Sequence, residues 1–333
     1  MRGHPALAFV ASAVVAAAAG CGSGPSSSGG GGSSRSVYVA AQHAGEIERF
    51  DAATLERTAT WTIGGDPHIL AWDAAQKLLW VSSPKAGSLR AVDPATGKVV
   101  TTLSMAAPDG LAFVPGSGML LVTSGIAPGR VAVVNTVAKA VVAYIAVGTG
   151  PHAIAVSADG SRAYVTDQYS NDVAVVDLAS RKLVSTIPLD GTPYFAALRD
   201  TTLFVSRAAN GKVSVVDVSS GRTTHEFQLP TGASQLAVSD DGKKLYVAVR
   251  GLAYFSGFPN GNVGETVAVI DLGTGASLDI KVPNGPDAVL LDGGSLLTTG
   301  LGQGTVSRVE LASGSVTTRT TGEFPTSVAI AAG

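Results

Sequence analysis

One segment of about 40 residues recurs along most of this chain, and its spacing restricts the possible folds more than any other feature. In its clearest copy, residues 150–191, four apolar stretches of strand length alternate with turn residues such as Ser-Ala-Asp-Gly. Gly, Asp, Asn and Ser supply the backbone conformations that tight turns require. Each copy therefore predicts a four-stranded antiparallel meander.

Two markers of the repeat can be followed along the chain. The residues that open the first stretch are Pro67, Pro108, Pro151, Pro193, Ala233, Pro286 and Pro325. The residues that close the third stretch are Asp51, Asp93, Asn135, Asp177, Asp217, Asp271 and Glu310, at successive spacings of 42, 42, 42, 40, 54 and 39. Such a period with four strands per unit is typical of β-propellers. The sequence predicts an all-β, seven-bladed propeller over residues 36–333.

The two ends of this region predict how the ring closes. Ser36-Val37-Tyr38-Val39 matches Arg162-Ala163-Tyr164-Val165, the second stretch of a unit. Its missing first stretch occurs at the other end of the chain, as residues 325–330. We therefore expect the C-terminal strand to complete the first blade, an arrangement that removes the open edges of the ring.

The second and third stretches also carry a motif. Tyr164-Val165-Thr166-Asp167, followed by Val173-Ala174-Val175-Val176-Asp177, resembles the YVTN repeat of the YncE-like seven-bladed propellers, and weaker copies such as residues 203–206 and 246–248 extend the match. The resemblance implies the propeller fold. It implies no single activity, because the wider superfamily includes enzymes, cofactor-bearing subunits and binding scaffolds.

The N-terminal 35 residues predict export and anchoring. Residues 1–20 read as a lipoprotein signal peptide, with Arg2 before an apolar stretch and Ala18-Ala19-Gly20-Cys21 resembling a lipobox. Cys21 is the sole cysteine, so no intramolecular disulfide is possible, and we expect it to be lipidated. The alternative is an ordinary secretory signal with an unrelated cysteine. Residues 21–35 are a Gly/Ser-rich tether. We expect a bacterial lipoprotein anchored to a membrane of the cell envelope on its extracytoplasmic side.

Composition and motifs exclude several functions. The net charge of −2 and 14% charged residues do not favour a nucleic-acid partner. The sequence has no nucleophile elbow after a strand, no phosphate-binding glycine loop and no His-Glu-x-x-His. The acids that close the third stretches are followed three residues later by Ser or Thr in six of seven copies, which indicates a role in turns.

The position directly after the opening residue is polar in every copy. It holds His68, Asp109, His152, Tyr194, Ser234, Asp287 and Thr326. Because the first strand of a blade is innermost, we expect these side chains to gather, exposed, around one mouth of the central channel. Convergent polar groups at a concavity predict a binding site. We assign ligand binding to His68, Asp109, His152, Tyr194 and Asp287. The alternative is that strand entrances are simply polar. No spacing identifies a metal or cofactor, and both remain unassigned.

A second set of residues is expected on the same face. The loops between second and third strands carry His43, Lys85, Asp167, Gln168, Tyr169, Arg207 and Arg250. The longest unit has its extra residues between Val249 and Glu265, with Tyr254, Phe255 and Phe258 among them. We predict that these three aromatic residues form a mobile rim of the ligand site, because long loops in compact domains are often functional. The alternative is that they fold back onto the blade.

These observations favour a lipid-anchored propeller that binds a protein partner or a small ligand at the channel mouth and is not itself catalytic. One alternative is a propeller enzyme of lactonase or lyase type, metal-assisted through His68 and His152. Another is an accessory subunit of an extracytoplasmic redox enzyme.

Overall fold

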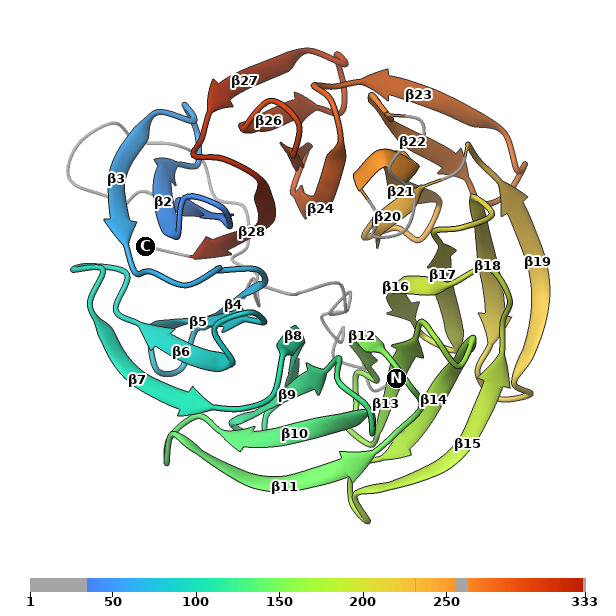
Figure 1. The fold of residues 1–333 in the computed structure, drawn as a ribbon. Helices are drawn as coiled ribbons and strands as arrows, with labels where there is room; N and C mark the ends of the chain where they lie inside the picture. The colour runs from blue at the N-terminus through green and yellow to red at the C-terminus, as the bar shows by residue number, and fades with distance from the viewer. Residues whose placement is uncertain (1–34, 231, 255–262, 332–333) are drawn as a thin grey trace, which may run out of the picture.

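The computed structural model describes residues 35–230, 232–254 and 263–331. Its strands form seven separate four-stranded antiparallel sheets. Figure 1 shows these sheets arranged as blades around a central axis, with β28, β4, β8, β12, β16, β20 and β24 innermost. The predicted fold, a seven-bladed all-β propeller, is confirmed.

The blades are numbered from the N-terminus, with strands given from the axis outward. Blade 1 contains β28 (Pro325–Ala331), β1 (Ser36–Ala41), β2 (Glu46–Asp51) and β3 (Arg57–Thr62); blade 2 contains β4 (Leu70–Asp73), β5 (Leu78–Ser83), β6 (Ser88–Val92) and β7 (Val99–Ser104). Blade 3 contains β8 (Pro108–Val114), β9 (Met119–Ser124), β10 (Arg130–Asn135) and β11 (Ala140–Ala146); blade 4 contains β12 (Pro151–Val156), β13 (Arg162–Asp167), β14 (Asp172–Asp177) and β15 (Lys182–Pro188). Blade 5 contains β16 (Pro193–Arg199), β17 (Thr202–Arg207), β18 (Lys212–Asp217) and β19 (Arg222–Gln228). Blade 6 contains β20 (Ala233–Val238), β21 (Lys244–Val249), β22 (Thr266–Asp271) and β23 (Ser277–Lys281), with a 3₁₀ turn at η1 (Leu252–Tyr254); blade 7 contains β24 (Pro286–Asp292), β25 (Ser295–Gly300), β26 (Thr305–Glu310) and β27 (Val316–Thr320).

The ring closes where the sequence predicts. Strand β28 pairs antiparallel with β1, and Val328 lies opposite Val39. Every residue of β28 is buried. Because β28 comes from the C-terminal end and β1 from the N-terminal end of the described chain, blade 1 holds the two ends of the domain together.

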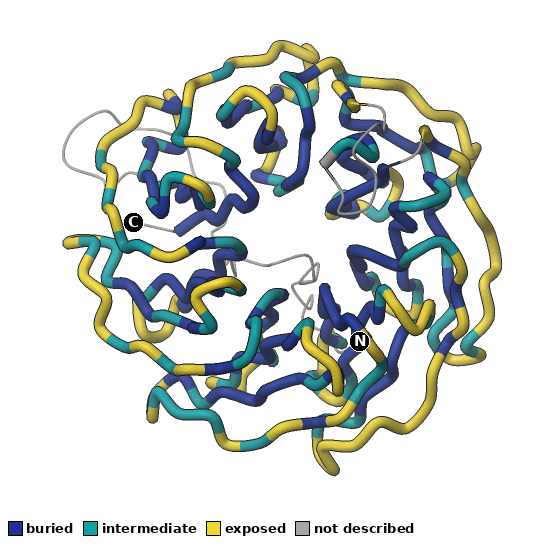
Figure 2. The backbone as a smooth tube through the Cα atoms, viewed as in Figure 1, coloured by how far each residue is buried: buried dark blue, intermediate teal, exposed yellow. Residues whose placement is uncertain are grey.

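Burial follows the position of a strand in its blade. In blade 4, β12, β13 and β14 are almost wholly buried, whereas β15 is exposed along most of its length. Figure 2 shows the same gradient around the ring, with buried inner strands and exposed outer ones. The inner strands are packed on both faces, which explains their uninterrupted runs of Val, Ala and Leu.

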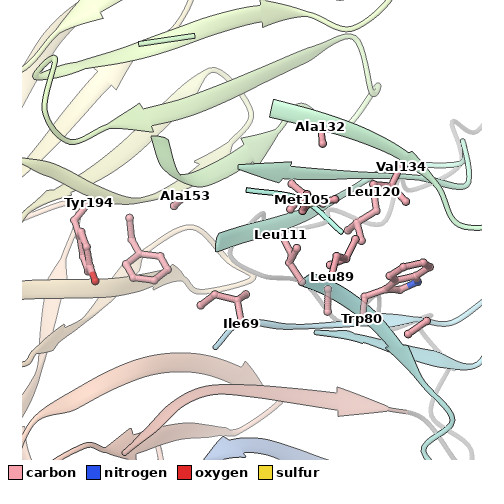
Figure 3. Close-up of a cluster of buried hydrophobic side chains, with 14 of the residues drawn as sticks. Ile69, Trp80, Leu89, Met105, Leu111, Leu120, Ala132, Val134, Ala153 and Tyr194 are labelled. Atoms are coloured by element: carbon pink, nitrogen blue, oxygen red, sulfur yellow. The ribbon is translucent and has the colours of Figure 1, made fainter. Parts of the chain in front are cut away.

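The apolar core lies largely between neighbouring blades. One cluster joins Trp80 and Leu89 of blade 2 to Leu111 and Leu120 of blade 3, and it extends inward to Tyr194 of blade 5. Figure 3 shows these side chains in one layer, with Tyr194 at one end and Trp80 at the other. The packing of each blade therefore depends on its neighbours.

The repeated acids hold turns, as the sequence predicts. The side chain of Asp177 accepts a hydrogen bond from the Ser180 N–H at 2.7 Å, and that of Asp271 accepts one from the Thr274 N–H at 2.8 Å. These hydrogen bonds lower the pKa of both carboxyls.

Within the ranges that the structure describes, no helix is long and apolar enough to cross a membrane.

Candidate functional site

The innermost strands share an irregularity that places the site residues. In blades 3 to 7 the register of the first strand shifts immediately after its opening residue, for example between Pro151 and Ile154 in blade 4 and between Pro193 and Ala196 in blade 5. Such a bulge takes a residue out of the regular ladder and redirects its side chain. The polar position identified in the sequence lies within this shift.

Side-chain hydroxyls of the second strands satisfy the backbone at this irregularity. In five blades the residue after the polar position donates its N–H to a Ser or Thr oxygen at 2.7 to 3.1 Å. The acceptors are Ser82, Thr123, Thr166, Ser206 and Thr299. Thr166 is the threonine of the Tyr-Val-Thr motif. This motif residue therefore has a structural role, because it pairs a buried N–H that the ladder leaves open.

The same hydroxyls tie adjacent blades together. Thr166 donates to the Tyr194 carbonyl at 2.7 Å, and Thr123 donates to the His152 carbonyl at 2.8 Å. At Gly110 a Cβ atom would lie only 1.9 Å from the His152 carbonyl oxygen, so this close approach of β8 and β12 requires glycine. The close approach brings Asp109, the residue before Gly110, next to His152.

Three polar residues from blades 2, 3 and 4 meet there. His68 Nδ1 lies 2.8 Å from Asp109 Oδ1, and His152 Nε2 lies 3.7 Å from Asp109 Oδ2. The other ring nitrogen of His152, Nδ1, is 3.0 Å from the Tyr194 carbonyl oxygen. Since a carbonyl oxygen only accepts, Nδ1 carries the hydrogen, and in the neutral ring Nε2 keeps its lone pair on the side of Asp109.

A second polar group lies across the axis, in blades 5, 6 and 7. Arg250 donates to Asp287 Oδ1 at 2.7 Å and to the Tyr194 hydroxyl at 3.1 Å. Ser234 donates to the same Asp287 oxygen at 2.6 Å. All four side chains are buried, and the ion pair between Arg250 and Asp287 compensates both charges.

Ring stacking joins the two groups. The rings of His152 and Tyr194 stack with centroids 3.9 Å apart, and Phe195 packs edge-on against both. We call this connected set the central network: His68, Asp109, His152, Tyr194, Ser234, Arg250 and Asp287. It contains residues from six of the seven blades.

Burial and neighbouring charge set the protonation of the network. Burial lowers the pKa of His68, but the charge of Asp109 and its hydrogen bond outweigh this effect, so the pKa of His68 lies above its ordinary value. Burial dominates at His152 and lowers its pKa. Burial raises the pKa of Asp109, but the two histidines overcome it and the net shift is downward. These shifts favour a charged His68–Asp109 pair beside a neutral His152.

Tyr194 remains neutral as well. Burial is the main reason that the pKa of Tyr194 rises to about 12, although the positive charge of Arg250 acts in the opposite direction. The network thus holds the pairs His68–Asp109 and Arg250–Asp287, the rings of His152 and Tyr194, and the hydroxyls of Tyr194 and Ser234.

The predicted convergence of the polar ring is correct, but the predicted exposure is wrong for most of its members. His152, Tyr194 and Asp287 are only 3%, 8% and 4% exposed. The side chains of His68 and Asp109 are 17% exposed and are the most accessible part of the network's first group. The inner strands converge so closely that each polar side chain contacts its neighbours. Thr326, the blade 1 member, is likewise buried and donates to the His68 carbonyl at 2.7 Å.

The sequence pattern does not predict that Arg250 belongs to the network. Its loop does lie on the expected face, since the Arg250 N–H donates at 3.0 Å to the carbonyl of Gly232, which lies in the connection from blade 5 to blade 6. The side chain nevertheless turns inward to Asp287 and Tyr194. Arg207 is also buried, contrary to its expected place on the loop face, and pairs with Asp190 and Glu226. Nothing in the local sequence signals either orientation.

The remaining loop residues differ in exposure. Tyr169 and His43 are exposed, and the His43 ring stacks on that of Phe324 at 4.3 Å. Of the predicted aromatic rim, Tyr254 ends the η1 turn, whereas Phe255 and Phe258 lie outside the described residues. The rim therefore stays a prediction.

Asp167 of the same loop set is fully buried. Its Oδ2 accepts the Gly148 N–H at 2.9 Å, and its cross-strand partner is Asp172. Burial, followed by the adjacent charge of Asp172, raises the pKa of Asp167 to about 8. The pKa of Asp172 is also raised by burial, so the two carboxyls share their protons.

The side chains of the network limit the kinds of ligand and reaction that it can support. Among the residues that the structure describes, no group of three or more His, Cys, Asp or Glu side chains is placed to hold a metal ion. A small pocket adjoins His152 and is otherwise lined by apolar side chains and backbone, including Ile69, Leu111 and Phe195. The arrangement offers fixed hydrogen-bonding groups rather than a nucleophile beside a base.

Comparisons with known proteins agree with this architecture. A protein-family model described as outer membrane protein assembly factor BamB matches residues 85–320. The YncE protein of Salmonella typhimurium is 33% identical over 99 residues, which span 29% of this chain and 28% of that relative. A seven-bladed β-propeller protein of Mycobacterium tuberculosis is 30% identical over 132 residues, 38% of this chain and 31% of that protein.

Solved structures show the same fold at low sequence identity. The periplasmic gluconolactonase of Pseudomonas aeruginosa superposes with a TM-score of 0.71 at 17% identity, over 90% of this chain and 100% of that one. Hydrazine synthase of Kuenenia stuttgartiensis gives 0.70 at 21% identity, over 82% and 91%. The chain belongs to the propeller family whose model is described as outer membrane protein assembly factor BamB, and it is a YncE-like seven-bladed β-propeller.

Proposed function

We propose that this protein is a lipid-anchored, extracytoplasmic propeller that binds a small polar ligand at the central network and performs no chemistry of its own. The observation that carries the proposal is the network itself, in which side chains from six blades meet through hydrogen bonds, ring stacking and the 3.7 Å approach of His152 to Asp109. Polar groups that converge at the axis of a rigid ring are a typical basis for small-ligand recognition.

Preorganisation supports a binding role. Each side chain of the network is fixed by a partner from another blade, so little conformational freedom remains to be lost when a ligand binds. The accessible members, His68 and Asp109, present one pair to the channel, while the Arg250–Asp287 pair across the axis is buried.

The contacts of the network do not favour catalysis. Ser234 donates its hydroxyl hydrogen to Asp287, a carboxylate that Arg250 already engages. An activated serine needs an adjacent base that accepts its proton, most often a histidine. The structural likeness to a gluconolactonase concerns the fold alone and does not raise the enzyme alternative above the binding one.

The proposed location rests on the N-terminal sequence and the relatives. Residues 1–20 have the features of a lipoprotein signal peptide and residues 21–35 those of a flexible tether. The family model is described as an outer membrane protein assembly factor, which agrees with a place in the cell envelope.

Ligand binding is tested by thermal unfolding of the purified protein with panels of neutral polyols, carboxylates and amines. A ligand at 100 times its Kd raises the free energy of unfolding by about 2.7 kcal/mol. We expect one class to raise the melting temperature of the wild type and of an Asp217→Asn control, but not of Asp109→Asn. Stabilisation of all three proteins alike, or conversion of the compound into product, would overturn the proposal.

The anchor is tested separately with a radiolabelled or alkyne-bearing fatty acid. Cys21→Ser should abolish labelling and release the protein from the membrane fraction, because the cysteine is the acyl acceptor in a lipobox. Labelling of the variant at the wild-type level would contradict the anchor while leaving the ligand site untouched.

A further inference from the structure

We propose that the ligand of the central network is a neutral compound with two hydroxyl groups on adjacent carbons, which bind Asp109 Oδ2 and His152 Nε2. This inference rests on the proposed ligand-binding role and names the chemical class that the site accepts. Its basis is the geometry around Asp109.

The first step concerns two hydrogen-bond acceptors that face each other. His152 donates Nδ1–H to the Tyr194 carbonyl at 3.0 Å, so Nε2 of the neutral ring is an acceptor. Asp109 Oδ2 lies 3.7 Å from it, beyond hydrogen-bonding distance. Two acceptors at this separation do not bind each other, but each can accept a hydrogen bond from a donor group placed beside both.

The second step concerns the neighbouring donor. His68 Nδ1 is engaged by Asp109 Oδ1 at 2.8 Å, which leaves Nε2 at the opposite edge of the ring. The raised pKa of His68 favours the protonated ring, in which Nε2 carries a hydrogen. The site thus offers two acceptors and one donor on neighbouring side chains. Two adjacent hydroxyls match the two facing acceptors, because each hydroxyl donates one hydrogen bond.

The third step excludes a charged ligand. The carboxylate of Asp109 is already balanced by His68, and that of Asp287 by Arg250. An ammonium group placed against Asp109 would lie beside the His68 ring, and a carboxylate at the acceptor pair would face Asp109. Both like-charge contacts are unfavourable in a buried site. A neutral polyol or sugar avoids them.

The site is also reachable and rigid. The side chains of His68 and Asp109 are 17% exposed, whereas His152 is held by its stack on Tyr194 and by the Gly110 contact. Asp109, one member of the acceptor pair, therefore lies at the boundary between the channel and the packed interior, where a hydroxyl group can approach it from the channel side.

The test uses nuclear magnetic resonance of the histidine rings in the purified full chain. The probes are myo-inositol, cis-cyclohexane-1,2-diol, cyclohexane-1,4-diol and ethanolamine. The two cyclohexanediols have the same composition and differ only in hydroxyl spacing. The chain has five histidines, and the exposed rings of His43 and His225 serve as internal references.

We expect myo-inositol and the 1,2-diol to shift the His68 and His152 resonances in a saturable way, with His43 and His225 unchanged. The 1,4-diol should bind more weakly by a factor of at least about ten, because it loses one hydrogen bond to a charged group. Stronger binding of ethanolamine, equal binding of the two diols, or no response to any probe would overturn the inference.

Two variants locate the effect. Asp109→Asn removes the charged acceptor at nearly constant shape. His152→Phe keeps the stack on Tyr194 and removes Nε2, and the Tyr194 carbonyl retains the hydrogen bond from Thr166. Both should lose about ten-fold or more in affinity for the 1,2-diol, as read from the His68 resonance. If ethanolamine binds at these residues and the polyols do not, the polyol inference fails while the binding function stands.

Discussion

Asp167 shows how one buried carboxyl makes the stability of this fold depend on pH. Its side chain is fully buried at the end of β13, where it accepts the Gly148 N–H and lies opposite Asp172. Its raised folded-state pKa of about 8 means that the folded protein holds a proton which the unfolded chain releases near pH 4. The stabilising effect of this protonated carboxyl is fully present below about pH 4 and is lost as the pH rises toward 8.

Asp167→Asn should therefore stabilise the protein at alkaline pH. The amide cannot ionise, and its oxygen can still accept the Gly148 N–H. We expect an increase in the free energy of unfolding of about 1–3 kcal/mol at pH 8.5 and a much smaller change at pH 4. Chemical unfolding at both pH values measures the difference. A variant less stable than the wild type at pH 8.5 would show that the carboxylate is favourably compensated in the fold.

At the scale of the strand, the bulge in the innermost strands of blades 3 to 7 is the feature that builds the site. The register shift frees a backbone N–H, and a hydroxyl on the second strand accepts it, as in blades 4 and 5. In blade 4, Thr166 accepts from the Ala153 N–H at 3.0 Å and donates to the Tyr194 carbonyl of blade 5. The hydroxyl thus supports both its own blade and the contact with the next.

Thr166→Val tests this role at nearly constant side-chain volume. It leaves the buried Ala153 N–H without its acceptor, so we expect a loss of about 1–3 kcal/mol in the free energy of unfolding. The control is Thr186→Val on the exposed outer strand β15, which should change stability by less than about 0.5 kcal/mol. Equal effects of the two substitutions in chemical unfolding would mean that the bulge hydroxyl is dispensable.

At the scale of the whole molecule, stability depends on closing the ring. Strand β28 supplies Val328 and Ile330 to an apolar cluster that also contains Val37 and Val39 of β1. Without β28, blade 1 would expose both the edge of β1 and apolar surface that is now buried.

Deletion of residues 324–333 should abolish cooperative unfolding or cause aggregation. Size-exclusion chromatography and a thermal melt followed by circular dichroism are the measurements. Removal of residues 332–333 alone, which leaves β28 whole, should melt like the full chain. If the longer deletion also melts like the full chain, closure through β28 is not what holds the ring.

The site could be predicted only in part, for reasons that are visible in single residues. The positions of His68, Asp109, His152, Tyr194 and Asp287 follow from the repeat, since each occupies the same place in its copy. Their burial does not follow, because it depends on how closely seven strands approach the axis. The repeat places Arg250 on an outer loop, but its side chain turns inward to Asp287, 37 positions away.

The amino-acid sequence alone determines the number of blades, the order of strands and the closure by residues 325–330. The reason is that repeat spacing and turn residues are local features, and they recur in each copy of the repeat. Which polar residues touch depends instead on the three-dimensional fold. His152 meets Tyr194 and Asp109 from neighbouring blades, and Arg250 meets Tyr194 across 56 positions. Contacts of this kind arise where separate blades converge, and no spacing within a single blade encodes them.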